Sequence, residues 1–262
     1  MKTRLDAELV RRGLARSREA ATDLIAAGNV LVGGMPASKA ASQVDAETSI
    51  TLKDDHAEFV SRGGHKLAGA LDKFTQIDVG GKTALDAGAS TGGFTDVLLK
   101  RGAKKLVAVD VGYGQLAWEL QKDERVKILD RVNVRNLTPA QVGEEIDLVV
   151  ADLSFISLKL VLPALISVAK EGADFLVMVK PQFEVGKEKL GAGGVVRDVH
   201  LRKEAVVAVA DAAFALNLGT LGVVASPLPG PSGNVEYFLW LRKGAPALLE
   251  VDLDLAIEKG PA

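Results

Sequence analysis

The chain has 262 residues, with 32 Lys and Arg against 34 Asp and Glu and a net charge of −2. Apolar residues make up 48% and charged residues 25%, a globular composition that excludes disordered and collagen-like chains. The chain has no Cys, which excludes disulfides, thiolate zinc sites, iron–sulfur clusters and Cys nucleophiles. The three His are scattered, and the sequence therefore predicts no metal site. The near-neutral charge gives no overall sign of a nucleic-acid partner, but an average can hide segregated charges.

The first five residues lead directly into charged, helix-like sequence, so we expect no secretory signal and a cytoplasmic location. The longest apolar stretch, Ala205–Ala225, contains Asp211 and Asn217. A membrane-spanning helix needs about 20 mostly apolar residues without such a charge. The stretch is therefore predicted to be a buried helix followed by a strand.

Residues 1–54 form one compositional unit. Asp6–Arg12 and Ser17–Ala27 have helical periodicity, and Ser17 is a candidate N-cap. Val30–Val32 and Ser49–Leu52 are typical of short strands. The first 18 residues carry six basic side chains against Asp6 and Glu8. A charge cluster alone more often indicates a solvated helix face than a binding surface. The basic residues are Lys2, Arg4, Arg11, Arg12, Arg16 and Arg18.

Residues 55–60 are predicted to be an interdomain linker, residues 61–244 a larger α/β domain, and residues 245–262 a peripheral tail. In the larger domain, apolar strand-like runs alternate with helical stretches, which indicates a mostly parallel, seven-stranded sheet covered on both faces. The expected strands are Lys82–Leu85, Lys105–Val109, Val126–Leu129, Ile146–Ala151, Phe175–Val179, Thr220–Ala225 and Val235–Arg242. The last two should form an antiparallel hairpin. The expected helices are Phe94–Lys100, Leu116–Gln121, Leu158–Lys170 and Leu201–Leu216.

A glycine-rich turn follows the first strand of this domain, with the pattern D-x-G-x-S-x-G beginning at Asp86. Glycines let a backbone approach a nucleotide-like ligand closely. An acidic residue at Asp86 repels phosphate but suits a cation, such as the amino group of a methionine moiety. Asp110 ends the next strand, 22 residues after Gly88, where a carboxylate can accept from both ribose hydroxyls. Asp130 ends the third strand, where it could meet an adenine amino group. These features indicate S-adenosylmethionine, and the alternative is a structural turn with incidental Asp caps.

Four further polar residues, Lys66, Asp152, Lys180 and Glu236, should reach the same edge of the sheet. Each alone could be an ordinary surface charge, but a strand as buried as Phe175–Val179 seldom ends in an unpaired ammonium. Together they suit methyl transfer to an alcohol, which must lose its proton as it attacks the methyl group. An ordinary lysine is charged at neutral pH. Lys180 therefore has two possible roles. It could accept the proton as a neutral amine, or it could stay charged and orient the lone pair of the hydroxyl. The sequence leaves both possibilities open.

The chain resembles the TlyA family of ribosomal RNA 2′-O-methyltransferases, historically labelled hemolysins. The resemblance rests on Arg4-Leu5-Asp6, Arg16-Ser17-Arg18, Ser61-Arg62-Gly63, His65-Lys66-Leu67 and the runs 86–95, 110–118, 151–157, 179–186 and 225–242. It implies an N-terminal RNA-binding domain of the alpha-L type and a class I, Rossmann-like methyltransferase domain similar to FtsJ. It also implies that Lys66, Asp152, Lys180 and Glu236 form the Lys-Asp-Lys-Glu tetrad of FtsJ-like enzymes. The cofactor-binding positions are expected to be Asp86, Gly88, Ser90, Thr91, Gly92, Phe94, Asp110, Val111, Asp130 and Asp152.

The substrate class that the resemblance implies is the cytidine 2′-hydroxyl in ribosomal RNA, in assembled small or large subunits. It also implies sensitivity to ribosome-targeting cyclic peptide antibiotics. The chain looks closest to the longer actinobacterial type, which acts on both the 16S and 23S RNA. It departs from that type at the linker, because Ala57-Glu58-Phe59-Val60 stands where an Arg-x-Trp-Val sequence is common. Phe59 can replace the aromatic anchor, but the Arg is absent.

RNA docking is expected to use backbone phosphates, with Arg4, Arg16, Arg18 and Lys39 as the contacting residues. No stable membrane association and no metal are expected. Two other hypotheses stand beside the enzyme. A membrane-active hemolysin would need a spanning helix or a barrel, and neither pattern is present in the sequence. A non-catalytic ribosome assembly factor would not need the intact tetrad.

Overall fold

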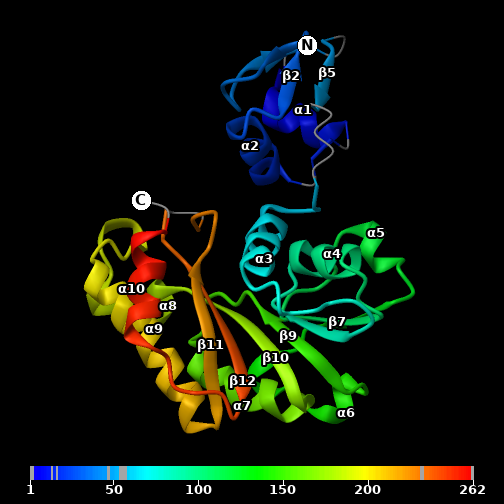
Figure 1. The fold of residues 1–262 in the computed structure, drawn as a ribbon. Helices are drawn as coiled ribbons and strands as arrows, with labels where there is room; N and C mark the ends of the chain where they lie inside the picture. The colour runs from blue at the N-terminus through cyan, green and yellow to red at the C-terminus, as the bar shows by residue number, and fades with distance from the viewer. Residues whose placement is uncertain are drawn as a thin grey trace. The chain divides into compact units, whose positions relative to one another are not determined.

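The computed structural model describes residues 3–12, 14–15, 17–45, 48–52, 58–230 and 233–260. The chain divides into two compact units between Glu58 and Phe59 (Figure 1). This boundary falls inside the expected linker 55–60, of which residues 55–57 lie outside the described part. The two units are taken separately below.

The N-terminal unit contains two short helices and two small antiparallel sheets. Ser17 is the N-cap of the second helix, as predicted, because its side chain accepts a hydrogen bond from Ala20 N at 3.1 Å. The core is small, and Leu5, Leu9 and Val30 have no exposed surface in it. The elements are β1 Thr3–Arg4, α1 Leu5–Arg11, α2 Arg18–Ala26, β2 Val30–Val32, β3 Met35–Pro36, β4 Gln43–Val44 and β5 Ile50–Leu52. Strands β1, β3 and β4 have two residues each, too few to show an alternating pattern in the sequence.

The larger unit is built on a seven-stranded sheet in the order β11-β12-β10-β9-β6-β7-β8. Neighbouring strands are parallel except for β12, which pairs antiparallel with both β10 and β11. The predicted fold class and the predicted antiparallel hairpin are therefore confirmed. The strands are β6 Thr83–Ala87, β7 Lys105–Asp110, β8 Val126–Asp130, β9 Ile146–Ala151, β10 Ala169–Val179, β11 Leu218–Ala225 and β12 Tyr237–Lys243.

Helices cover both faces of this sheet (Figure 1). Side chains alternate between the faces along each strand. On β9, Leu148 and Val150 pack with α3 and α4, whereas Val149 and Ala151 pack with α7 and α9. The helices are α3 Arg62–Lys73, α4 Gly93–Lys100, α5 Trp118–Gln121, α6 Pro139–Val142, α7 Leu158–Val168, α8 Pro181–Glu184, α9 Val199–Ala215 and α10 Glu250–Glu258. Short 3-10 turns occupy Val134–Asn136, Lys187–Lys189 and Ala192–Gly194.

Two expectations need correction. The predicted helix Leu158–Lys170 ends at Val168, and β10 begins at Ala169, before a register shift against β9. The segment 245–262 is not peripheral, since Leu253 of α10 is fully buried in the main core. The alternating sequence Asp252-Leu253-Asp254-Leu255 does not predict this contact. Its two leucines look equivalent in the sequence, but Leu253 is buried and Leu255 is exposed.

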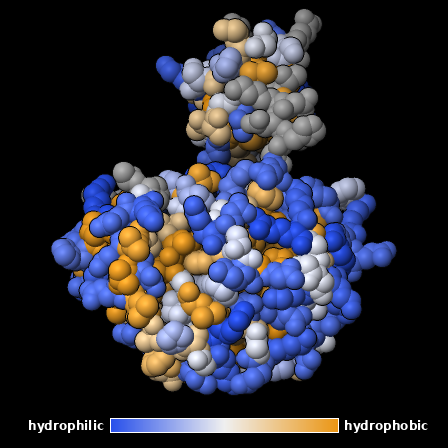
Figure 2. All heavy atoms as spheres, viewed as in Figure 1, coloured by the Kyte–Doolittle hydropathy of each residue, from blue (hydrophilic) through white to orange (hydrophobic). Residues whose placement is uncertain are grey.

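The apolar stretch 205–225 forms the end of α9 and the strand β11, as predicted. Among the described residues, no helix is sufficiently long and apolar to cross a membrane. Figure 2 shows hydrophobic side chains gathered on the side of the larger unit where α9 and α10 lie. Phe214, Val251 and Leu255 are 50%, 61% and 43% exposed there.

Asp174 links the early part of β10 to β12 and β6. Its side chain is 2% exposed and accepts hydrogen bonds from Trp240 Nε1 at 2.8 Å and from Arg242 Nη2 at 2.6 Å. Lys82 Nζ lies 3.2 Å from its second oxygen. One buried carboxylate therefore satisfies donors from two other strand regions at the amino end of the sheet.

Replacing Asp174 with Ala should lower the free energy of unfolding by about 2–4 kcal/mol, because it leaves the buried Trp240 Nε1 and two partly buried cations without their acceptor. Urea unfolding followed by tryptophan fluorescence would measure this loss. Asp174→Asn keeps an oxygen acceptor for Trp240 and should lose less. A wild-type unfolding midpoint for the Ala variant would show that the network contributes little.

Candidate functional site

The predicted site residues meet at the carboxyl edge of the sheet, where open α/β sheets bind ligands. Asp152 follows the last residue of β9, and Lys180 follows the last residue of β10. Because β12 runs antiparallel, its start lies at this same edge. Val179 pairs with Tyr237, so Lys180 and Glu236 occupy adjacent positions just beyond that pair. Strand register alone therefore brings three of the four tetrad residues together.

Lys66 and Glu236 form a buried ion pair. Lys66 Nζ donates to Glu236 Oε2 at 2.6 Å, and the two residues are 7% and 0% exposed. Lys66 comes from the first turns of α3. The other carboxylate oxygen of Glu236 accepts no hydrogen bond from the described residues. Burying an ion pair costs desolvation energy that the pairing alone seldom returns, so this pair is weak evidence for a role in stability.

Lys180 forms the second pair. Its ammonium lies 2.6 Å from Asp152 Oδ1 and donates to Ser154 Oγ at 3.0 Å. Lys180 is 9% exposed, so a nearly buried ammonium is held from two sides. The sequence interpretation missed Ser154, although its position two residues after a strand-end carboxylate was an available signal.

The glycine-rich loop lies directly against this second pair. Gly88 has φ +88°, and a Cβ there would stand 2.5 Å from the carbonyl oxygen of Asp152. Gly92 has φ +98° and is the N-cap of α4. Only glycine fits both positions comfortably, because a side chain would be strained by the backbone and would also clash. The loop is thereby drawn against the end of β9.

The two strand-end acids beside the loop bind backbone amides. Asp110 accepts from Ser90 N at 2.8 Å and from Gly112 N at 2.7 Å, and Asp130 accepts from Gly114 N at 2.9 Å. Asp110 and Asp130 are partners in the β7–β8 register. Val111, expected to contact the cofactor, is 67% exposed at this edge. Thr91 accepts from Ala117 N at 3.0 Å through its carbonyl and fixes the loop to the start of α5.

Asp86 and Phe94 lie beneath the loop, and their side chains do not line its surface. Asp86 is fully buried and accepts from Thr95 Oγ1 at 2.7 Å, while its Oδ1 has no partner among the described residues. Burial raises the pKa of Asp86 to about 7, and the nearby charges of Asp152 and Asp110 act in the same direction. Phe94 is 3% exposed and packs against Phe238. The Asp86 side chain is therefore buried against the first turn of α4, and its expected role toward a cofactor stays a prediction.

Two exposed aromatic rings, those of Phe155 and Tyr113, belong to loops that follow strands at this edge, and the sequence interpretation missed them. Phe155 is 91% exposed and has φ +63°, a left-handed conformation that is unusual for a bulky residue. Its ring centroid lies 5.1 Å from that of Phe183, which follows Lys180 by three residues. Tyr113 is 70% exposed, with the Arg131 guanidinium 4.3 Å from its ring.

In the N-terminal unit, Asp6 holds two of the predicted RNA-binding residues. Arg4 and Arg18 both donate to Asp6 Oδ2 at 2.9 Å, yet their side chains stay 46% and 59% exposed. The Arg4 hydrogen bond is the main cause of the strongly lowered pKa of Asp6, and Arg18 adds to it. Lys39 is exposed. Arg16 lies outside the described residues.

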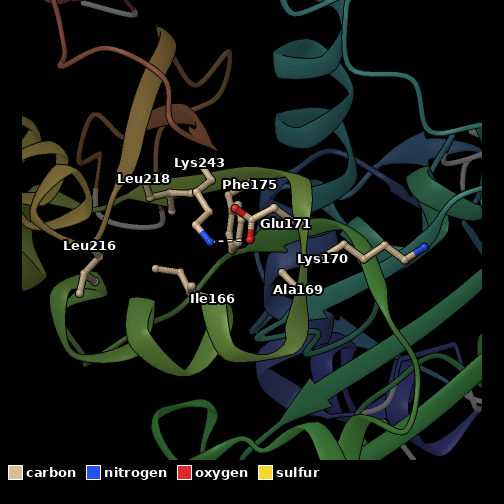
Figure 3. A pocket seen from close by; sticks show the side chains of 8 residues that line it. All are labelled: Ile166, Ala169, Lys170, Glu171, Phe175, Leu216, Leu218 and Lys243. Carbon is tan, nitrogen blue, oxygen red and sulfur yellow. Dashed lines mark hydrogen bonds and ion pairs between the residues drawn. The ribbon is translucent and has the colours of Figure 1, made fainter.

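A small pocket of about 110 Å³ lies at the opposite edge of the sheet (Figure 3). Its walls include Phe175 and Leu218, and an ion pair between Lys243 and Glu171 crosses it at 2.5 Å. It contains none of the predicted site residues. Within the described ranges, no three His, Asp or Glu side chains are grouped in a way that could hold a metal ion.

Comparisons with known proteins identify the families to which the two domains are similar. The FtsJ-like methyltransferase family matches residues 59–243, and the S4 domain family matches residues 3–50. The chain is 57% identical, over 99% of both sequences, to the 16S/23S rRNA (cytidine-2′-O)-methyltransferase TlyA of Mycobacterium tuberculosis.

Two solved structures extend the comparison. One is named a hemolysin, from Streptococcus thermophilus, and it matches with a TM-score of 0.79 and 36% identity over 98% of this chain and 95% of that one. The other is an S-adenosylmethionine-dependent methyltransferase from Listeria monocytogenes, with a TM-score of 0.51 and 14% identity over 68% of this chain and 99% of that one. The second likeness shows the fold alone. In this chain, an S4 domain is followed by an FtsJ-like methyltransferase domain. Its sequence, its two domains and its fold show that the chain belongs to the TlyA family.

Proposed function

We propose that the protein transfers a methyl group from S-adenosylmethionine to the ribose 2′-hydroxyl of cytidine in ribosomal RNA. The observation that carries this proposal is the convergence of Lys66–Glu236 and Lys180–Asp152 beside a glycine-rich loop. The name of the Mycobacterium tuberculosis relative supports the choice of cytidine and of both the 16S and 23S RNA. The S4 domain supports an RNA substrate.

The residues at the loop fit S-adenosylmethionine. Asp110 ends its strand beside the exposed Val111, and each of its oxygens retains a lone pair for a ribose hydroxyl. Asp130 stands at the neighbouring strand end. The unpartnered oxygen of Asp86 leaves a buried acidic group beneath the loop. This group would favour the positive charge of the cofactor through the loop, without touching it.

In the proposed reaction, the cofactor would supply an electrophilic methyl group, and the protein residues would prepare the hydroxyl. Asp152 and Ser154 fix the direction of the Lys180 ammonium. Lys180 then either accepts the hydroxyl proton or, still charged, orients its lone pair and stabilises the developing alkoxide. The Lys66–Glu236 pair would hold the ribose from the other side. Much of the acceleration would come from this alignment.

The exposed rings suit a target taken out of its stack. Sequence-specific RNA recognition often places an unstacked base on an aromatic side chain. Phe155 and Phe183 are next to Lys180, so a base resting on them would bring its ribose to the ammonium. Acting on assembled subunits would place the enzyme in the cytoplasm. Loss of the modification would then reduce sensitivity to cyclic peptide antibiotics that bind there.

Replacing Lys180 with Ala should reduce methyl transfer by roughly 100-fold or more, because a positioned acid–base group contributes about 10²–10⁴-fold. Cofactor affinity should change by no more than about twofold, since Lys180 is not among the expected cofactor-binding residues. Purified small and large subunits would be incubated with protein and cofactor, and digested RNA would be analysed by mass spectrometry for 2′-O-methylcytidine.

Lys170→Ala is the matched control, because Lys170 is an exposed lysine paired with Asp147 at the other edge of the sheet. Full activity of the Lys180 variant would contradict the mechanism. Binding of wild-type protein to subunits without any methyl transfer would favour the assembly-factor hypothesis.

The raised pKa of Asp86 predicts a pH-dependent stability. Its folded pKa of about 7 exceeds the ordinary 3.8, so the folded chain holds this proton more tightly than the unfolded chain. The resulting stabilisation is complete below about pH 4 and is lost as pH rises through 7. Wild-type stability should therefore fall between pH 5 and pH 8 relative to Asp86→Asn, as urea midpoints would show. Asp72→Asn, at an exposed carboxylate on α3, is the control, and parallel curves for wild type and Asp86→Asn would refute the assignment.

Arg18→Ala should weaken RNA binding and make it less sensitive to salt. Each lost phosphate contact lowers the slope of log affinity against log salt by about 1. Arg4 still bonds Asp6 in this variant, so the domain should remain folded. Fluorescence anisotropy with an rRNA fragment at several salt concentrations would measure the slope. Arg125→Ala, which also removes an Arg paired with Asp, is the control, and an unchanged slope for Arg18→Ala would exclude a phosphate contact.

A further inference from the structure

Glu184 joins the two segments that carry Lys180 and Asp152. It is the last residue of α8, four positions after Lys180. Its Oε2 accepts from Ser157 Oγ at 2.5 Å, and its Oε1 accepts from Leu158 N at 2.8 Å. Ser157 and Leu158 are the N-cap and first residue of α7, which follows the loop that begins at Asp152.

This carboxylate is held in place by strong contacts. Both acceptors in the bridge are carboxylate oxygens, and hydrogen bonds to an ionised group are shorter and stronger than neutral ones. The amide of Leu158 also belongs to a helix N-terminus, where a negative charge is favoured. Partial burial of Glu184 acts against its ionisation and raises its pKa. Glu184 is not a member of the tetrad, yet its carboxylate is partly desolvated. It therefore differs from an ordinary solvent-exposed surface charge.

The Glu184 bridge and the Lys180–Asp152 pair form two cross-links between the same two segments. One segment runs from Asp152 to Leu158 and the other from Lys180 to Glu184. The loop between the cross-links therefore has both ends fixed. It contains Ser154, which also binds Lys180, and Phe155, whose backbone is left-handed. Such a backbone conformation is strained for a bulky residue and persists only where its surroundings hold it.

We infer that Glu184 is a positioning residue for methyl transfer: by clamping Ser157 and the start of α7 to α8, it fixes Asp152 and Ser154 against Lys180. It acts through Ser157 and the start of α7, to which its hydrogen bonds connect it. The same clamp holds the rings of Phe155 and Phe183 together, since each ring belongs to one of the joined segments. This inference rests on the proposed function.

The test compares Glu184→Ala, Glu184→Gln and Ser157→Ala in the full-length protein. Glu184→Ala should lower kcat by about 10–100-fold, because small misplacements of reacting groups have effects of this size. The KM for ribosomal subunits and the Kd for S-adenosylmethionine should stay within about twofold. Glu184→Gln should recover most of kcat, since its amide oxygen can accept from Leu158 and its amide NH₂ can donate to Ser157. Ser157→Ala keeps the Leu158 contact and should lie between wild type and Glu184→Ala.

Glu250→Ala is the matched control, because this exposed glutamate of α10 pairs with Lys203 and lies outside the proposed machinery. Cofactor titration calorimetry would count the folded, binding-competent fraction of each variant. An unchanged kcat in Glu184→Ala, a loss that merely follows the folded fraction, or an equal loss in Glu184→Gln would each overturn the inference. Inactivity of the wild type on both subunits would instead overturn the proposed function, whatever the variants do.

Discussion

The antiparallel insertion of β12 beside β10 is the constraint on which the site depends. In a purely parallel sheet, the residue that precedes a strand lies at the amino edge, away from the ligand. Because β12 is reversed, Glu236 precedes its strand at the carboxyl edge and stands next to Lys180. Lys66 then reaches Glu236 from α3, which packs on one face of the sheet. The reversed strand thus completes a set of charges that the parallel strands alone could not assemble.

The site concentrates buried charge in a small volume, which determines much of its chemistry. Lys66, Lys180, Asp86 and Glu236 are all at most 9% exposed. Each lysine has one carboxylate within 2.6 Å, so the charges compensate in pairs. Burial raises the pKa of Asp86, and among the described side chains no cation pairs with it. A cationic cofactor bound at the loop would supply a positive charge to compensate the Asp86 carboxylate.

The strands, their order of appearance and the glycine-rich loop could be predicted because their patterns are local. Buried strand segments such as Phe175–Val179 are uninterrupted apolar runs, and Ser17 is a capping residue at the start of a helical period. The polar residues at strand ends could also be anticipated, since parallel strands end at one edge. Short elements such as β1 and β4 lack enough residues for a pattern, and the burial of Leu253 depends on a partner far away in sequence.

The sequence by itself determined the fold class, the glycine-rich loop and the polar residues that follow the strands, because periodicity, glycine spacing and strand-end charges are features of consecutive residues. The tertiary structure decided which charges pair. Lys66 pairs with Glu236, which lies 170 residues away in the sequence, and Lys180 contacts both Asp152 and Ser154. It also decided that Asp86 and Phe94 lie beneath the loop, that Phe155 stands exposed, and that Glu184 bridges two segments. These outcomes depend on strand register and helix packing, which bring distant residues within a few ångströms and which no local pattern specifies.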